Sequence, residues 1–256
     1  MTRSVRVGAA ILVIALMAAG CGDRGSGGVP TLRDAGLAAA SDEALARCAQ
    51  RLGLPDELPR PADSTNFGVR QRRDDSGREV PHRPGLIVLH ETVLSAEATL
   101  NYFATPHPRD EDQASYHLLV DRQGRRLRIA EDGARAYGAG MSAFGDFTVR
   151  IRPDAVGSIN NVALHLGLES PPDGRGDAAA HSGYTPQQYR TAAAQVLLWQ
   201  ARFGIPLSRL TTHAAVDRSR SRYDPRSFRW DRFEAPYREA AQRCGFTAYD
   251  TGQAAP

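Results

Sequence analysis

Two residues that commonly bind metal ions lie close together near the end of the chain. His213 and Asp224 are eleven residues apart, with Arg222 between them. That spacing is too long for one face of a helix, so a folded-back loop would have to bring the imidazole and the carboxylate to one metal ion. A third ligand must then come from another part of the sequence.

The best candidate for the third ligand is His90, which follows the apolar run Leu-Ile-Val-Leu at residues 86–89. Such a run predicts a buried strand that presents a polar side chain at its end. Two histidines and one carboxylate leave a fourth tetrahedral position open, as in catalytic zinc sites, where a metal-bound water performs hydrolysis. The alternative is that His90 only caps or packs, since the chain has seven histidines.

Strands and helices that would surround these residues are visible as periodic patterns. Residues 116–129 alternate around Asp121-Arg-Gln-Gly124 and predict a hairpin, with Tyr116 and Leu118 on one face and His117 on the other. Residues 162–169 also alternate, so that His165 and Glu169 share a face. Helices are predicted at residues 41–54, 95–103 and 185–204, the last with a capping box at its start and Gly204 as its stop.

Seven short motifs, in this order, resemble those of the zinc-dependent type-2 N-acetylmuramoyl-L-alanine amidases, whose fold the peptidoglycan-recognition proteins share. The motifs are IVLH at 87–90, SYHLLVDRQG at 115–124, AYGAG at 136–140, LGLE at 166–169, GYTPQQY at 183–189, TH at 212–213 and DP at 224–225. The resemblance covers roughly residues 84–236 and implies an α/β fold with a mixed central β-sheet flanked by helices.

The resemblance also implies roles for individual residues. His90, His213 and Asp224 match the ligands of a zinc ion (Zn2+), and His117 is the main rival ligand. Glu169 matches the catalytic glutamate that holds the zinc water, although it could instead be a surface glutamate at the end of a strand. The residues expected to contact substrate are Tyr116, His117, Tyr137 and His165. His165 matches no ligand of the family, and the alternative is that it lies behind the metal ligands rather than in the groove.

The chain departs from the family pattern at two places near the expected site. Arg222 stands where many relatives carry a lysine, and an arginine can stabilise an oxyanion but cannot donate its proton. Tyr137 and Gly138 stand where many relatives have a tryptophan and a histidine, so the contacts of that histidine must be absent or replaced.

The N-terminus predicts export and a lipid anchor. Residues 1–20 contain two arginines and then a short apolar run, as in a signal peptide, and the small residues before Cys21 resemble a bacterial lipobox. Ordinary signal cleavage is the alternative. We expect residues 21–61 to hold the lipidated cysteine, a tether and a helical arm, residues 62–246 the amidase domain, and residues 247–256 a tail. The Pro-rich residues 55–61 are expected to form a loop on the domain surface. A cell with two membranes would carry the protein on its outer membrane, facing the periplasm.

Charge and cysteine usage restrict the partners and the compartment. A net charge of +3 with scattered arginines gives no argument for nucleic acid. Once Cys21 is lipidated, Cys48 and Cys244 form an even pair whose disulfide would suit an oxidising compartment, with two free thiols as the alternative.

These observations predict a monomeric zinc amidase that cleaves between N-acetylmuramic acid and L-alanine in peptidoglycan or muropeptides. Two other classes remain open, a recognition module that binds peptidoglycan without cutting it and an anchored lipoprotein that makes only protein contacts.

Overall fold

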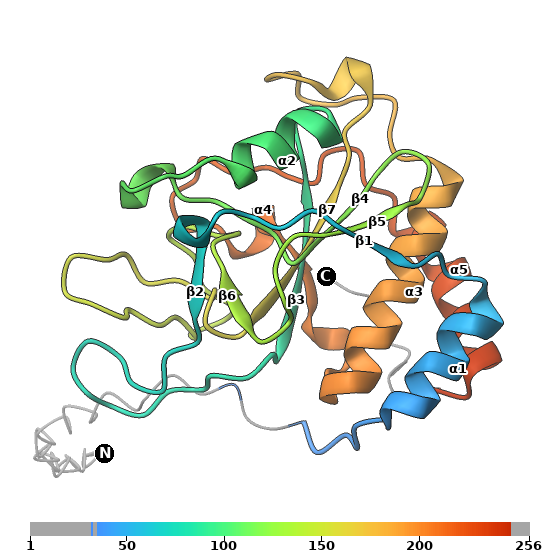
Figure 1. Cartoon of the computed structure of the whole chain (residues 1–256), viewed down its shortest axis with the longest axis horizontal. Coiled ribbons are helices and arrows are strands. Elements are labelled where there is room, and N and C mark those ends of the chain that lie inside the picture. The colour runs from blue at the N-terminus through green and yellow to red at the C-terminus, as the bar shows by residue number, and fades with distance from the viewer. Residues whose placement is uncertain (1–31, 33–34, 247–256) are drawn as a thin grey trace, which may run out of the picture.

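A six-stranded mixed sheet runs through the centre of the molecule (Figure 1). Its strand order is β1-β5-β4-β7-β3-β8, and β4 pairs antiparallel with β5 while the other neighbours pair in parallel. The strands are Glu57–Pro59 (β1), Leu86–Glu91 (β3), Leu118–Val120 (β4), Arg126–Arg128 (β5), Ala163–Leu168 (β7) and Leu210–Thr212 (β8). Phe67–Val69 (β2) and Ala134–Ala136 (β6) form a separate antiparallel pair.

The computed structural model describes residue 32 and residues 35–246. The predicted signal peptide, Cys21 and the C-terminal tail lie outside the described residues. Within the described part, no helix combines the length and the apolar character needed to cross a membrane.

Helices α3 (Pro186–Phe203) and α5 (Trp230–Cys244) pack against one face of the sheet. Helix α2 (Ala96–Ala104) and the loop that contains Phe147 and Ile159 pack against the other face. Two more helices are Asp42–Leu52 (α1) and His213–Val216 (α4). Short 3-10 turns occupy Ser64–Asn66, Asp110–Asp112, Pro172–Gly174 and Leu207–Arg209. Figure 1 shows α1, α3 and α5 together on one side.

The burial of the two central strands follows from this layering. All six residues of β3 and all six of β7 are buried. Leu164, Leu166 and Leu168 pack into a core shared with α3 and α5, whereas Leu86 and Val88 pack against the loop that contains Phe147 and Ile159. A strand with both faces covered needs apolar residues at successive positions, which explains the run at the start of β3. The mixed sheet flanked by helices confirms the predicted fold class.

The predicted helix boundaries at α3 are confirmed. The Thr185 hydroxyl accepts the N–H of Gln188, and the Gln188 side chain accepts the N–H of Thr185, so the capping box is complete. Gly204 ends the helix in the left-handed conformation, with φ of 66°. This helix forms the scaffold behind the sheet.

A disulfide joins Cys48 of α1 to Cys244 of α5, as the sequence predicted. The bond spans a sequence separation of 196 residues. It fastens the N-terminal arm to the last helix, and α1 also packs against α3.

Two local predictions were wrong. Residues 55–61 were expected to form only a surface loop, but β1 lies within them and pairs in parallel with β5. The Glu57 carboxylate accepts hydrogen bonds from Arg126 and Arg128, at 3.0 and 2.6 Å, and holds the strand in place. Pro59 is tolerated because β1 is an edge strand.

The second error concerns Tyr116, which was expected to share a face with Leu118. Because β4 begins only at Leu118, the chain can bend before it, and the Tyr116 ring packs against Phe103 with 5.1 Å between ring centroids. It joins the cluster that contains Leu119, on the opposite face from Leu118.

Candidate metal centre and active site

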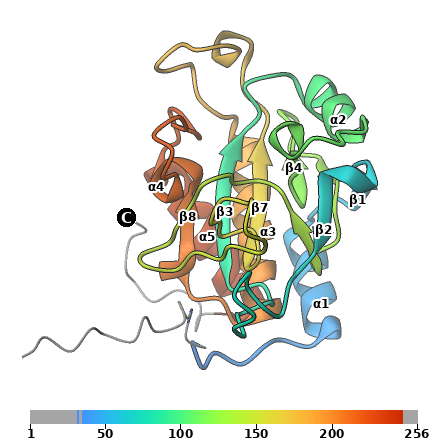
Figure 2. The same ribbon diagram turned by 90° about the vertical axis from the view of Figure 1, so that its left-hand side faces the viewer.

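The ends of neighbouring parallel strands bring the two predicted histidine ligands together. His90 lies near the end of β3, and His213 directly follows β8, which is hydrogen-bonded to β3. Asp224 lies between α4 and α5, and its carbonyl oxygen accepts the N–H of Ala214 at 2.9 Å. Figure 2 shows β8, β3 and β7 side by side, with α4 beside the end of β8.

The geometry of these three residues fits a metal ion. The ligand atoms of His90, His213 and Asp224 all lie within 4.8 Å of one another, and all three residues are buried. His213 Nδ1 is 2.9 Å from one carboxylate oxygen of Asp224, and His90 Nδ1 is 3.3 Å from the other. The His90 contact lacks hydrogen-bond geometry, so within the described residues Nδ1 is a buried nitrogen with no hydrogen-bond partner. A cation between the three side chains would satisfy it.

The electrostatics of the site favour the protonation states that bind metal. Burial lowers the pKa of His90 to about 4, despite the opposing effect of Asp224, so its imidazole is neutral at neutral pH. Burial alone would raise the pKa of Asp224, but the contacts with His213 and His90 hold that pKa well below its usual range. Neutral imidazole and ionised carboxylate are the forms that coordinate metal ions.

Two further histidines lie behind His90. His165 Nδ1 is 2.9 Å from His90 Nε2, and the backbone N–H of His165 donates to His117 Nδ1 at 3.0 Å. A metal ion on His90 Nδ1 would leave the hydrogen on Nε2, which would then donate to His165 and orient the ligand ring. His117 contacts Arg70 and the Ala134 carbonyl rather than the ligand cluster.

Both of these side chains are fully buried. His117 and His165 are 0% exposed, so neither offers surface to a substrate. His165 contacts His90 and fits the alternative of a residue that supports a ligand, and His117 contacts His165 in turn. Of the other two residues predicted to contact substrate, Tyr116 stacks on the His90 ring with 4.6 Å between centroids, and Tyr137 lies under the Arg135 guanidinium. Both tyrosines are partly exposed.

A glycine makes room for the His165 ring and explains one departure from the family pattern. A Cβ atom at Gly138 would lie 2.4 Å from His165 Cγ and Nδ1. The space in front of residue 138 is therefore filled by a histidine from β7. A larger residue at position 138 would collide with the His165 ring, so Gly138 and His165 fit together.

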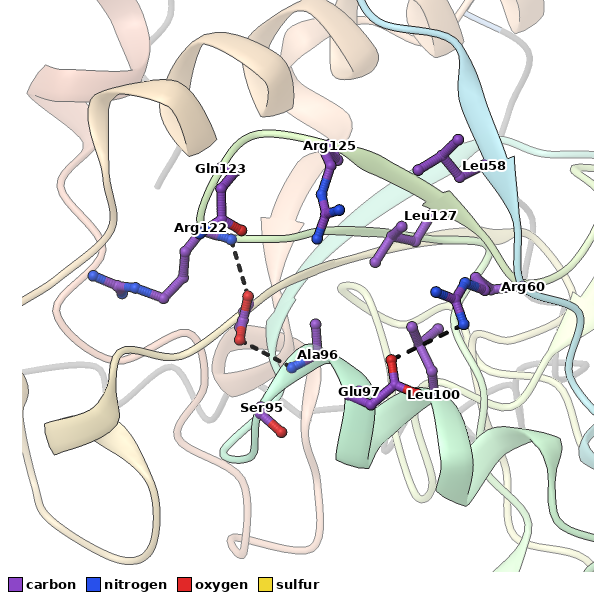
Figure 3. Close-up of a pocket in the computed structure, with 11 residues that line it drawn as sticks. Leu58, Arg60, Ser95, Ala96, Glu97, Leu100, Arg122, Gln123, Arg125 and Leu127 are labelled. Atoms are coloured by element: carbon purple, nitrogen blue, oxygen red, sulfur yellow. Dashed lines mark hydrogen bonds and ion pairs between the residues drawn. The ribbon is translucent and has the colours of Figure 1, made fainter.

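Glu169 lines a pocket of about 230 Å³. Figure 3 shows this pocket between the start of α2, at Ser95 and Ala96, and the β4–β5 turn, at Arg122 and Gln123. The two carboxylate oxygens of Glu169 accept the backbone N–H groups of Ala96 and Arg122, at 3.1 and 3.0 Å. Each oxygen keeps a further lone pair for a water or a proton. The structure thus anchors Glu169, the residue directly after β7, through the backbone amides of two other segments.

Arg222 lies on an exposed loop whose backbone N–H groups are bound by the side chain of Asp217. Asp217 accepts the backbone N–H groups of Ser219, Ser221 and Arg222, at 3.1, 2.9 and 3.2 Å. Next to the larger effect of burial, the charge of Arg222 contributes to the lowered pKa of His90. Its guanidinium is therefore within electrostatic reach of the ligand cluster.

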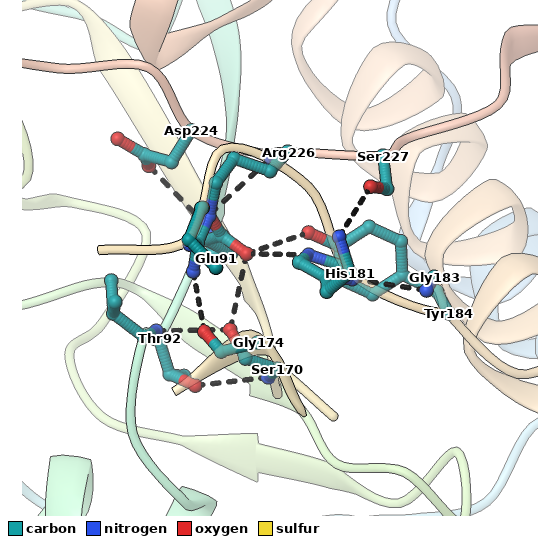
Figure 4. Close-up of polar contacts among 12 residues, drawn as sticks. Glu91, Thr92, Ser170, Gly174, His181, Gly183, Tyr184, Asp224, Arg226 and Ser227 are labelled. Atoms are coloured by element: carbon teal, nitrogen blue, oxygen red, sulfur yellow. Dashed lines mark hydrogen bonds and ion pairs between the residues drawn. The ribbon is translucent and has the colours of Figure 1, made fainter. Parts of the chain in front are cut away.

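Sequence reasoning missed a buried ionic cluster beside the metal ligands (Figure 4). Glu91 directly follows His90 and pairs with Arg226 and His181, at 2.5 and 2.9 Å. The available signal was a glutamate inside a fully buried strand, because an enclosed carboxylate requires a partner.

The fold and this site define a class of protein, a mixed α/β protein in which two histidines at the ends of parallel strands and one carboxylate from a loop are placed to hold a metal ion. The family model of the N-acetylmuramoyl-L-alanine amidases matches residues 80–227, more than half of the 256 residues. The chain belongs to this family. It is accordingly an amidase that acts on peptidoglycan, as the order of the motifs predicted.

Three solved structures resemble this chain. A selenomethionine derivative of AmpD is 22% identical with a TM-score of 0.50, over 70% of this chain and 93% of that one. AmiD from E. coli, in complex with anhydro-N-acetylmuramic acid-L-Ala-D-gamma-Glu-L-Lys, is 19% identical with a TM-score of 0.47, over 60% and 57% of the two chains. AmpDH3 from Pseudomonas aeruginosa, in complex with anhydromuramic pentapeptide, is 16% identical with a TM-score of 0.47, over 71% and 70%. No curated protein gives a significant sequence match.

Proposed function

We propose that the chain is a zinc-dependent amidase that cleaves the amide bond between the lactyl group of N-acetylmuramic acid and the L-alanine of the stem peptide. The observation that carries this proposal is the unpartnered Nδ1 of His90, which points into a cluster with His213 and Asp224. When bound, zinc supplies Lewis-acid chemistry, which polarises the amide carbonyl and acidifies water.

The protein residues divide the remaining tasks among them. Glu169 is the proposed general base, which accepts the proton of the attacking water through a lone pair that the Ala96 and Arg122 amides leave free. Arg222 supplies positive charge for the oxyanion that develops on the carbonyl oxygen, and it keeps its own proton. Tyr116 and Tyr137, both partly exposed, are the proposed substrate contacts.

The test is zinc content measured together with release of stem peptide from purified peptidoglycan, with and without chelator. Protein that lacks residues 1–21 serves as the sample. We expect about one zinc per chain and chelator-sensitive release of peptides that begin with L-alanine.

Other results would redirect the proposal. Bound zinc without release would indicate a different amide as substrate, and wall binding without zinc would indicate a recognition module. A His213→Ala variant that keeps both zinc and turnover would contradict the ligand assignment.

We also propose that the protein is exported and anchored in the cell envelope by a lipid on Cys21. The Cys48–Cys244 disulfide supports an oxidising compartment. Labelling of cells with a radioactive fatty acid should mark the wild-type protein and leave a Cys21→Ala variant unlabelled. Equal labelling of the two would contradict the anchor.

A further inference from the structure

The Glu91 carboxylate is completely enclosed and accepts hydrogen bonds from four different residues. Its side chain is 0% exposed. The donors are Arg226 Nε at 2.5 Å, His181 Nε2 at 2.9 Å, Ser170 Oγ at 3.1 Å and the Tyr184 hydroxyl at 3.2 Å. An ion pair this deeply buried is a poor source of stability, since desolvation offsets much of the attraction. A positional role accounts better for its presence.

The ion pair joins the two chain segments that carry metal ligands. Glu91 is adjacent to His90, and Arg226 is two residues after Asp224. The backbone N–H of Glu91 also donates to the Asp224 carboxylate at 3.4 Å, and that of Arg226 donates to the Glu91 carboxylate at 3.3 Å. Segments more than 130 residues apart in the sequence are therefore fixed to each other beside the ligand cluster.

The same ion pair fastens the segment between β7 and α3, residues 170–184, which we call the insert. Ser170 and Tyr184 lie at its two ends, and His181 lies inside it (Figure 4). The Arg226 guanidinium donates to the carbonyl oxygens of Gly174, Gly176 and Ala178. Residues 175–180 of the insert are exposed, so its shape depends on these anchors rather than on a core of its own.

The bonds of His181 also fix its tautomer. His181 Nδ1 accepts the backbone N–H of Gly183 at 3.0 Å, so the hydrogen lies on Nε2 and points at Glu91. The backbone N–H of His181 donates to Ser227 Oγ at 2.9 Å, which adds a second link between the insert and the segment that carries Asp224.

We propose that Glu91 and Arg226 are positioning residues that couple metal affinity to the conformation of the insert. The inference rests on the proposed metal centre. Loss of the pair frees the Asp224 segment and the insert together, and because coupling is reciprocal, zinc binding in turn holds the insert in place.

The experiment compares full-length wild-type protein with a Glu91→Gln/Arg226→Gln variant, which removes both charges and leaves none unpaired. Zinc affinity is measured by competition with a chelating dye. Insert mobility is measured as trypsin cleavage after Arg175, the single arginine between residues 170 and 184, which contain no lysine. Fragments are resolved under reducing conditions, because the disulfide would otherwise hold them together.

We expect zinc affinity to fall about 10- to 100-fold, the range seen when outer contacts of metal ligands are removed. Cleavage at Arg175 should become faster, and added zinc should slow it in the wild-type protein but not in the variant. The matched control is Glu57→Gln/Arg126→Gln, which removes an ion pair of 3.0 Å between β1 and β5. It should leave zinc affinity and the Arg175 cleavage rate unchanged.

If the Glu91→Gln/Arg226→Gln variant binds zinc as tightly as the wild-type protein and is cleaved at Arg175 at the same rate, the positioning role is refuted. The proposed zinc centre would be unaffected by that result. A wild-type protein that binds no zinc would overturn both. Should the double variant fail to fold, Arg226→Lys keeps the charge but cannot reach all three insert carbonyls. That variant must show faster cleavage at Arg175, and unchanged cleavage would refute the anchoring of the insert by Arg226.

Discussion

The metal-free protein should lose stability in mild acid because its site histidines are buried without charge. His90 has a pKa of about 4 in the folded state, against an ordinary value of 6.5. Between these values the unfolded chain binds a proton that the folded chain does not, so the free energy of unfolding falls as the pH falls through this window. From pH 7 to pH 5 this single group should cost about 2 kcal/mol.

The neighbouring histidines should add to this loss in the same direction. Burial also holds the pKa values of His117 and His165 well below 6.5. Asp224 acts in a separate range, since its folded pKa is depressed and its contribution is lost only as the pH falls below the ordinary aspartate value of about 3.9. The loss between pH 7 and pH 5 therefore reports on the histidines.

Urea unfolding of chelator-treated protein at several pH values measures this effect. The midpoint should fall steadily below pH 6.5, and a His165→Gln variant should show a shallower dependence, because one buried imidazole has been removed. A free energy of unfolding that is the same at pH 7 and pH 5 would refute the reasoning, because it would mean that the folded protein accepts these protons freely.

Three further predictions concern stability and catalysis. Replacing Cys48 and Cys244 by alanine should lower the free energy of unfolding by up to about 5 kcal/mol, from the entropy of a loop of 196 residues, and an unchanged urea midpoint would contradict this. Gly138→Ala should displace the His165 ring and weaken zinc binding, measured by dye competition; unchanged affinity would show that the ring can move without consequence. Glu169→Gln should keep zinc but abolish peptide release, and loss of zinc in that variant would count against its role as base.

The sequence alone was enough to predict the features that depend on local patterns or on the order of motifs. The capping box of α3 was visible because Thr185 and Gln188 are three residues apart, and the period-two pattern of residues 162–169 correctly placed the leucines of β7 on one face. The buried-strand pattern singled out His90 as the third candidate ligand, and the family resemblance sharpened that choice, because His90 lies more than 120 residues from His213 and no local pattern joins them.

Features that depend on contacts between distant segments were missed. The partners of Glu91 come from the two ends and the interior of the insert and from the segment after Asp224, and no local pattern links them. The face of Tyr116 was predicted wrongly because alternation was extended beyond the first residue of β4. The place of His165 depended on the missing side chain at Gly138, a complementarity that a single sequence does not reveal.

The disulfide between Cys48 of α1 and Cys244 of α5 closes most of the chain into a covalent ring. Every peptide bond between Cys48 and Cys244, including those of the insert, lies inside this ring. A protease that cuts once within it opens the ring but releases no fragment, so both pieces stay attached to whatever holds the N-terminus. A cut at the exposed insert would therefore leave the two pieces covalently joined, and only reduction of the disulfide would remove that link.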